Sequence, residues 1–349
     1  MRRKTKIIKI GTKKIGGTNP VLVQSMCNTD THNVQATAIQ IKALEKEGCE
    51  IIRVAVLDMA AVKALGRIRK KIKIPLVADI HFDYRLAIES IKAGADKIRI
   101  NPGNIGSHDR LAQVAKAARL KNIPIRVGVN SGSLENEILK KYKGHPLPAA
   151  LVESAIKNIR LLEKMNFYSI VVSLKSANVL HTISAYRLLS EKIKYPLHLG
   201  ITEAGPPSTG IIKSAVGLGT LLAEGIGDTI RVSLTADPVD EVKAGWEILK
   251  ALNLRTRGRE IISCPTCGRT QIDLISLVKK VEAMTKDLKK PIKIAVMGCA
   301  VNGPGEAREA DIGVAAGKKT GIIFRKGKVI KTVKEKDILQ ALMEEIKKL

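Results

Sequence analysis

Short apolar runs alternate with longer amphipathic stretches through the first two thirds of the chain. Between the runs, apolar positions recur every three or four residues, as in helices buried on one side; Val34, Ala38, Ile41 and Leu44 form one such series, which Gly48 stops. This alternation predicts βα units around a parallel sheet. The runs expected to be strands are residues 21–26, 50–56, 74–80, 97–102, 123–130, 169–175, 196–202 and 229–234.

Eight strands, each followed by a helix, favour a TIM (β/α)8 barrel. A doubly wound sheet is the alternative, but that fold has no reason to stop at eight strands. Before the first strand, residues 1–17 alternate apolar and polar positions around Gly11, which predicts a β-hairpin.

The pattern changes after a polar and basic linker at residues 252–260. A strand leads to Cys264, a helix covers residues 273–288, and a second strand leads to Cys299. The segments "IGVAAG" and "GIIFRKGKVIKTV" and a final amphipathic helix complete a small α/β unit. We therefore expect the barrel at residues 1–254 and a smaller domain at residues 255–349.

Composition is that of an ordinary globular protein, with 45% hydrophobic and 27% charged residues among 349. No apolar run reaches eighteen residues, so no membrane span is expected. The basic N-terminus lacks the apolar core of a signal peptide, which favours a cytoplasmic location. In that reducing compartment the five cysteines are expected to be metal ligands or core residues rather than disulfides.

The formal net charge of +27 raises the possibility of nucleic-acid binding. The excess is spread along the chain, however, with +19 in the first 258 residues and +8 in residues 259–349, and only nine aromatic residues could stack on bases. We therefore do not expect nucleic acid as a partner. A positive field serves an anionic substrate or an acidic protein equally well.

Polar residues recur late in the predicted strands, where a barrel builds its active site. Positions two apart share a face of a strand, so these side chains are expected to converge. A single Arg or His is usually paired with a neighbouring acid, but the polarity recurs on at least six strands and only Asp79 and Glu203 are obvious counter-charges. Four arginines and a lysine at one mouth would suit a multiply charged anion, such as a diphosphate. The residues are Arg53, Asp79, His81, Arg99, Asn101, Arg126, Asn130, Ser173, Lys175, Thr202, Glu203, Arg231 and Ser233.

Three cysteines in the smaller domain suggest a metal site. Cys264 and Cys267 form the CxxC of "CPTCG", and Cys299 lies in "VMGCAVNGPGE". Zinc sites usually have four Cys or His ligands, and no histidine follows His198; a thioredoxin-like CxxC would leave Cys299 unexplained. Three thiolates with a replaceable fourth position favour an iron–sulfur cluster, with zinc as the alternative. The remaining cysteines, Cys27 and Cys49, are expected to be small buried residues.

Several motifs closely resemble the family of 4-hydroxy-3-methylbut-2-enyl diphosphate synthases, in its short two-domain bacterial form. They are "QSM", "ADIHFD", "RINPGNIG", "RVGVNSGSL", "GITEAG", "RVSLT", "SCPTCGR" and "VMGCAVNGPGEA", and they run over essentially the whole chain. The resemblance implies a [4Fe-4S] cluster held by three cysteines and a glutamate. Carried over, the ligands are Cys264, Cys267, Cys299 and Glu306.

The resemblance also implies a reaction. It is the reductive ring opening and dehydration of 2-C-methyl-D-erythritol 2,4-cyclodiphosphate to 4-hydroxy-3-methylbut-2-enyl diphosphate, in isoprenoid biosynthesis. Two electrons would come singly from flavodoxin or ferredoxin, acidic carriers that suit a basic surface. A head-to-tail homodimer is expected, with the cluster domain of one subunit over the barrel of the other.

Within this reaction we expect two groups of side chains. His81, Asp79, Thr202 and Glu203 would surround the carbon end of the substrate, with Glu203 as proton donor to the departing hydroxyl. The diphosphate would be held by Arg53, Arg99, Asn101, Arg126, Asn130, Lys175, Arg231 and Ser233.

Two other classes of protein stay open at this stage. One is a basic RNA- or protein-binding module with structural zinc, which would be colourless. The other is a cluster-dependent barrel dehydratase, which would need no external reductant.

Overall fold

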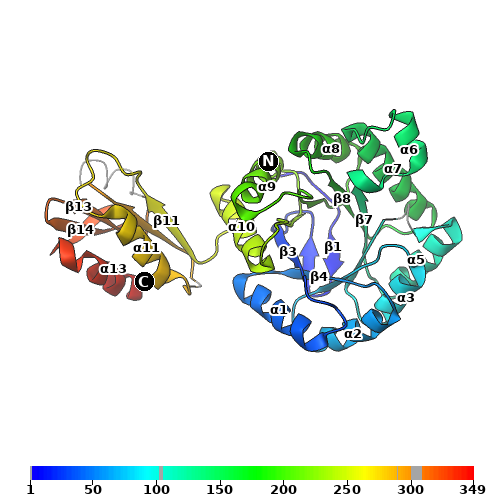
Figure 1. Ribbon diagram of the computed structural model, residues 1–349, viewed down its shortest axis with the longest axis horizontal. Helices are drawn as coiled ribbons and strands as arrows, with labels where there is room; N and C mark the ends of the chain where they lie inside the picture. The colour runs from blue at the N-terminus through cyan, green and yellow to red at the C-terminus, as the bar shows by residue number, and fades with distance from the viewer. Residues whose placement is uncertain (1, 102–104, 289, 300–308) are drawn as a thin grey trace. The chain divides into compact units, whose positions relative to one another are not determined.

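The computed structural model describes residues 2–101, 105–288, 290–299 and 309–349. Its contacts divide the chain into two units, Met1–Arg255 and Thr256–Leu349 (Figure 1). In the described part of the chain, no helix combines the length and the apolar character needed to cross a membrane.

The larger unit is a TIM barrel, as the alternating pattern predicted. Parallel pairing runs in chain order from β3 to β8, and β10 pairs with both β9 and β3. A bridge between Val172 and Leu197 joins β8 to the start of β9, so the ring closes. The strands are β3 (Leu22–Met26), β4 (Ile51–Ala55), β5 (Leu76–Asp79), β6 (Lys97–Ile100), β7 (Ile125–Asn130), β8 (Ile170–Lys175), β9 (His198–Leu199) and β10 (Thr229–Ile230).

Each predicted run contains a strand, but the last two strands are much shorter than predicted. The ladder ends at Leu199 and Ile230, where Gly200 and Arg231 follow.

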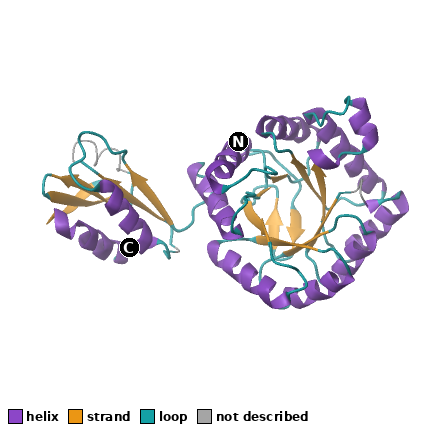
Figure 2. Ribbon diagram, in the orientation of Figure 1, coloured by secondary structure: helices purple, strands orange, loops and turns teal. Residues whose placement is uncertain are grey.

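Helices surround the sheet (Figure 2). Helix α1 has the predicted bounds: Asn33 caps its N-terminus by accepting from Ala36 N, and Gly48 ends it at a φ of 104°. The helices of this unit are α1 (Val34–Glu47), α2 (Met59–Arg69), α3 (Tyr84–Lys92), α5 (His108–Leu120), α6 (Asn136–Lys141), α7 (Pro148–Lys164), α8 (Val179–Lys192), α9 (Pro207–Ala223) and α10 (Pro238–Ala251).

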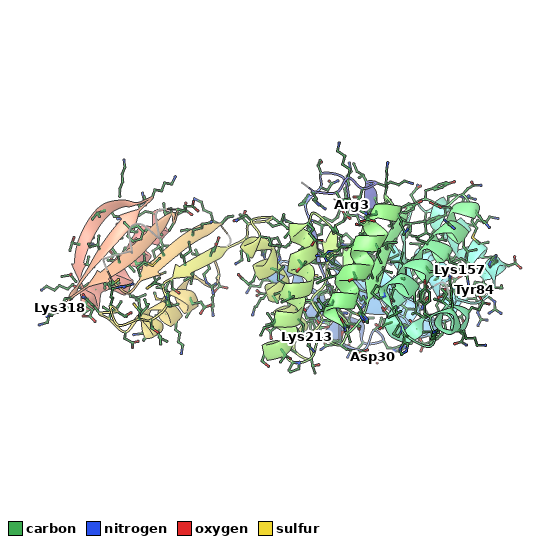
Figure 3. The ribbon with its side chains drawn as sticks, turned by 90° about the horizontal axis from the view of Figure 1, so that it is seen from above. Arg3, Asp30, Tyr84, Lys157, Lys213 and Lys318 are labelled. Carbon is green, nitrogen blue, oxygen red and sulfur yellow. The ribbon has the colours of Figure 1, made fainter. Side chains whose placement is uncertain are left out.

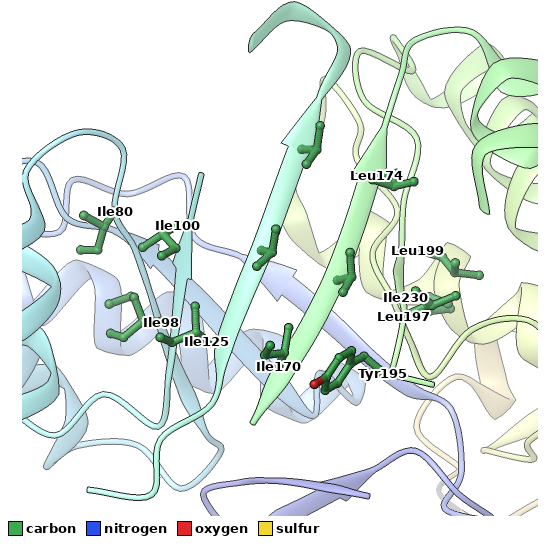
Figure 4. Packing of buried hydrophobic residues seen from close by; sticks show 14 of the residues in the cluster. Ile80, Ile98, Ile100, Ile125, Ile170, Leu174, Tyr195, Leu197, Leu199 and Ile230 are labelled. Carbon is green, nitrogen blue, oxygen red and sulfur yellow. The ribbon is translucent and has the colours of Figure 1, made fainter. Parts of the chain in front are cut away.

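The two faces of the barrel strands differ in chemistry. The outer face is apolar and packs under the helices; Ile98, Ile125 and Leu174 are among the side chains shown in Figure 4. On the inner face, an apolar cluster lies at the amino ends of several strands. There Leu22 and Val171 contact the predicted N-terminal hairpin, formed by β1 (Ile8–Ile10) and β2 (Lys13–Ile15). The hairpin therefore supplies apolar packing at that end of the barrel.

The smaller unit is the predicted α/β unit. Its five-stranded sheet has the order β11-β12-β13-β14-β15, with the first three strands parallel and the last two antiparallel. Two helices pack on one face of this sheet, through a core that includes Val281, Ile294 and Leu342. The elements are β11 (Arg259–Ser263), α11 (Leu274–Thr285), β12 (Ile292–Met297), β13 (Ile312–Gly317), β14 (Thr320–Arg325), β15 (Lys328–Lys334) and α13 (Ile338–Lys347).

Candidate active site

Charged side chains fill the middle of the barrel, where branched apolar residues are usual. All but Arg231, which directly follows β10, come from inward-facing positions of the strands. Buried charge on this scale needs compensation, because transfer of an ion from water into a protein interior is costly. The cations are Arg53, Lys97, Arg99, Arg126, Lys175 and Arg231, and five of the six residues are at most 7% exposed.

Asp79 is the central counter-charge. Its carboxylate accepts from Arg99 Nη1 at 3.2 Å and lies 3.7 Å from Arg53 Nε and 3.5 Å from His81 Nε2. Burial raises the pKa of Asp79, but the Arg53 charge and the His81 contact outweigh it and hold the pKa well below its usual range. Asp79 is therefore ionised and anchors two arginines inside the barrel.

The second counter-charge is Glu241 on α10, not Glu203 as expected. The Glu241 carboxylate accepts from Arg231 Nη2 at 3.2 Å, from Leu234 N at 3.0 Å and from Ser25 Oγ at 3.3 Å. Glu203 is exposed. The sequence gives no sign of this role, because an acidic residue in the first turn of a helix is common for another reason, its favourable interaction with the helix dipole.

The cations outnumber these two carboxylates. Arg126 is fully buried, and its Nε and Nη1 have no hydrogen-bond partner among the described residues. Arg53 donates to the sulfur of Met26, a weak acceptor, at 2.7 Å. Burial, together with the charge of Arg53, lowers the pKa of both Arg126 and Lys175 well below the usual range. Both shifts mean that the protonated forms of Arg126 and Lys175 are costly in this interior, and a bound anion would stabilise them.

Two buried residues of this interior, Lys97 and His198, were not selected as site residues from the sequence. Lys97 Nζ donates to Gln24 Oε1 at 3.1 Å. His198 Nδ1 is 2.8 Å from Thr229 Oγ1, and burial followed by the charge of Arg126 holds the pKa of His198 well below its usual range, so the ring is neutral. Lys97 shares a strand face with Arg99, so the alternation that selected Arg99 could also have selected it.

Glycines make room for the cations at two positions. A Cβ on Gly128 of β7 would lie 2.7 Å from Arg99 Nε, and a Cβ on Gly200 would lie 2.9 Å from Lys175 Nζ. A glycine inside a strand commonly marks such a close approach.

The remaining predicted barrel residues lie at the carboxyl ends of the strands. Asn101 Nδ2 donates to Ser133 Oγ at 3.2 Å, and Asn130, Thr202 and Ser233 are half-buried. Glu203 adopts a φ of 53°, which is unusual for a residue with a side chain and recurs at functional sites.

The three cysteines predicted to be metal ligands lie on neighbouring loops at one end of the smaller sheet. Gly298 N donates to Cys264 Sγ at 3.2 Å, which joins the CxxC loop to the residue before Cys299. Cys264 is half-buried, Cys267 exposed and Cys299 buried. Among the described residues no three His, Cys, Asp or Glu side chains are placed to hold a metal ion. Glu306 lies outside the described residues. The donor set suits an iron–sulfur cluster, because thiolates accepting backbone N–H bonds are its usual ligands.

Cys27 and Cys49 are buried, as expected of core residues. Burial raises the pKa of each thiol to about 12. Neither is therefore a thiolate at neutral pH.

Fold and site together define a class: a TIM-barrel protein with a cationic interior and an added domain that presents three cysteines. Two family models match the chain, the GcpE TIM-barrel domain over residues 5–246 and the GcpE protein C-terminal domain over residues 260–348. The chain belongs to the GcpE family.

Curated relatives match the chain from end to end. A protein of Caldanaerobacter subterraneus is 64% identical over 349 residues, which cover 100% of this chain and 98% of the relative. A protein of Clostridium tetani is 59% identical over 346 residues, covering 99% of each chain. Both are named 4-hydroxy-3-methylbut-2-en-1-yl diphosphate synthase (flavodoxin).

Two solved structures match about 70% of the chain. The dihydropteroate synthase of Yersinia pestis matches with a TM-score of 0.52 and 14% identity, covering 71% of this chain and 98% of that one. The enzyme of Thermus thermophilus matches with a TM-score of 0.51 and 12% identity, covering 70% and 99%. At these identities the likeness concerns the fold only.

Proposed function

We propose that the protein is an oxidoreductase that opens the ring of 2-C-methyl-D-erythritol 2,4-cyclodiphosphate and forms 4-hydroxy-3-methylbut-2-enyl diphosphate and water. The reaction consumes two electrons and two protons and serves isoprenoid precursor synthesis. The observation that carries the proposal is the excess of buried cations over carboxylates inside the barrel, because a diphosphate is the kind of anion that such an excess suits.

The barrel side chains hold the substrate. Arg126 is the most buried of the proposed diphosphate ligands, and two of its nitrogens have no hydrogen-bond partner in the described part of the chain. Asp79 keeps Arg53 and Arg99 in place, which orients their guanidinium groups toward the anion. The full set comprises Arg53, Arg99, Asn101, Arg126, Asn130, Lys175, Arg231 and Ser233.

The carbon end of the substrate lies nearer the mouth, beside His81, Asp79, Thr202 and Glu203. Glu203 is exposed at this end, so its carboxyl group is accessible to the substrate, and we assign to it the proton donated to the departing hydroxyl. His81, in contact with Asp79, orients the adjoining part of the substrate.

The smaller domain holds a [4Fe-4S] cluster through Cys264, Cys267, Cys299 and Glu306. When bound, this group supplies electrons to the substrate one at a time. The Gly298 N–H bond to Cys264 Sγ stabilises the charged thiolate and keeps that loop in place. A flavodoxin, the donor that the names of the relatives specify, delivers the electrons, and ferredoxin is the alternative.

The first test is the iron, sulfide and zinc content of protein purified without oxygen, with its electronic spectrum. We expect about four irons and four sulfides per chain, with a brown absorption that a reductant bleaches. Cys264→Ser should lose the cluster, whereas Cys49→Ser, which alters a buried core thiol, should retain it.

One zinc per chain in a colourless solution would instead identify the structural-zinc module and remove the redox mechanism. A normal cluster with turnover in the absence of any reductant would identify the dehydratase.

A further inference from the structure

The positive charge of the smaller unit is concentrated in one stretch of its sheet. Residues 318–336 contain eight basic residues and a single acid, Glu335. This stretch comprises the turn between β13 and β14, the strands β14 and β15, and the residues just after β15. The diffuse charge of the chain as a whole therefore has a local maximum here.

Strand register places one part of this stretch at the cysteine end of the sheet. β11, β12 and β13 are parallel, so Cys264, Cys299 and the turn after Gly317 all follow the carboxyl ends of their strands. Thr320 pairs with both Gly317 and Lys334, which brings the end of β15 to the same edge.

Four lysines therefore share an edge with the cysteines. Lys318 and Lys319 form the turn, and Lys334 and Lys336 lie at and just after the end of β15; all four are exposed. Figure 3 shows Lys318 at the tip of the sheet. We call these four residues the turn patch.

Among the described residues, ion pairs occur at only part of this stretch, at two of the four basic residues outside the turn patch. Away from it, Arg325 lies 3.9 Å from Glu345 and Lys331 lies 4.0 Å from Glu344, both on α13. In the described part of the chain, Lys318 and Lys319 take part in no such ion pair. Glu335 and Asp337 are the acids beside Lys334 and Lys336, so the patch retains a net positive charge.

The backbone also fixes the position of this turn. Lys319 adopts a φ of 64°, a left-handed conformation in which Gly or Asn is usual, and Glu335 N donates to Lys319 O at 3.1 Å. A two-residue turn tied to the neighbouring strand presents its side chains at a defined position.

We propose that the turn patch is the docking surface for the acidic face of a flavodoxin that reduces the protein. The assignment rests on the proposed function. Lys318 follows the strand next to that of Cys299, so its lateral offset from the two cysteine loops is about 5–10 Å, one to two strand spacings, and the lysines at the end of β15 lie two strands further along the sheet. Opposite charges at this edge steer the carrier to the side of the sheet where its electron is needed.

The test compares two matched charge reversals in the cluster-loaded protein. Lys318→Glu/Lys319→Glu alters the turn patch, and Lys326→Glu/Lys328→Glu alters the turn at the other end of the same strands. Each pair includes one lysine at a positive φ, at 64° for Lys319 and 47° for Lys326. Flavodoxin binding is measured by calorimetry at several salt concentrations, and turnover is measured with reduced flavodoxin and with dithionite.

We expect the turn-patch variant to lose roughly tenfold or more in flavodoxin affinity and flavodoxin-driven kcat/KM at low salt, with a flatter salt dependence. Dithionite-driven turnover should equal that of the unaltered protein, and the Lys326→Glu/Lys328→Glu variant should keep at least half of its flavodoxin affinity.

Equal losses of flavodoxin affinity in both variants would show that only net charge matters and would overturn the assignment. Unchanged flavodoxin affinity in the turn-patch variant would overturn it too. Binding of a short RNA to the turn patch in place of flavodoxin would overturn it as well. Failure of the unaltered protein to turn over with dithionite would contradict the proposed reaction, while the calorimetric comparison would still decide the docking surface.

Discussion

At the scale of single residues, Asp79 sets the charge balance inside the barrel. It contacts Arg53, Arg99 and His81 from a side chain that is only 3% exposed. The carboxylate stabilises the barrel in the absence of substrate, because it offsets two buried guanidinium groups.

Asp79→Asn should lower the free energy of unfolding by about 3 kcal/mol, because it leaves buried arginines without their counter-charge. Pyrophosphate should restore stability more in this variant than in the unaltered protein, since the anion neutralises the same groups. Denaturant unfolding with and without pyrophosphate measures both effects.

The difference in stability between Asp79→Asn and the unaltered protein should depend on pH in a defined direction. The pKa of Asp79 is lowered on folding, so its contribution to stability is present above the unfolded pKa of about 3.9 and is lost as the pH falls further. The difference in free energy of unfolding between the two proteins should therefore shrink below pH 4.

Asp83→Asn, which removes the charge from an exposed pair with Arg85, is the control and should lower the free energy of unfolding by less than about 1 kcal/mol. A loss that small in Asp79→Asn would contradict the assigned role.

At the scale of secondary-structure elements, the strands combine an outer apolar face with an inner charged one. Glycines are required at two inner positions, because large cationic side chains fill the space that a Cβ would occupy there. The steric requirement at Gly128 arises from Arg99 rather than from an unusual backbone angle.

Gly128→Ala should weaken pyrophosphate binding roughly tenfold, or about 1.4 kcal/mol, because the new methyl group displaces Arg99 from Asp79. Gly219→Ala in α9 is the matched control. A Cβ there meets nothing within 4 Å, so this change should leave binding intact and stabilise the helix by about 0.5–1 kcal/mol. Isothermal titration with pyrophosphate measures the affinities, and equal affinity in the two variants would show that Gly128 does not shape the anion site.

At the scale of the whole molecule, the proposed reaction needs the cysteine domain and the barrel to meet. The head-to-tail homodimer expected from the family resemblance would place the cysteine domain of one subunit over the barrel of the other. Complementation between two inactive variants distinguishes this arrangement from one in which each chain is complete.

Arg126→Ala disables the barrel site and Cys264→Ser disables the cluster, so each variant alone should be inactive. Mixed under conditions that exchange subunits, they should recover about one quarter of full activity, because half of the dimers are mixed and each carries one intact site. Activity is assayed with dithionite after mixing, against each variant incubated alone. No recovery despite proven subunit exchange would exclude sites shared between subunits.

The sequence by itself determined the order and type of the elements. Apolar periodicity located the eight barrel strands and the smaller α/β unit, because each element must bury one face whatever its distant neighbours are. The same alternation put Arg53, Arg99, Arg126 and Arg231 on one face of their strands, since the side-chain period of a strand is two.

Only the tertiary structure decided how these charges are compensated. Glu241 reaches Arg231 from a helix, Lys97 lies beside Gln24 from a distant strand, and Glu203 remains exposed. Local periodicity cannot show such pairs, because they depend on which side chains the closed barrel brings within a few ångströms. Electrostatic compensation acts through space, whereas the sequence pattern reports only which face of an element is buried.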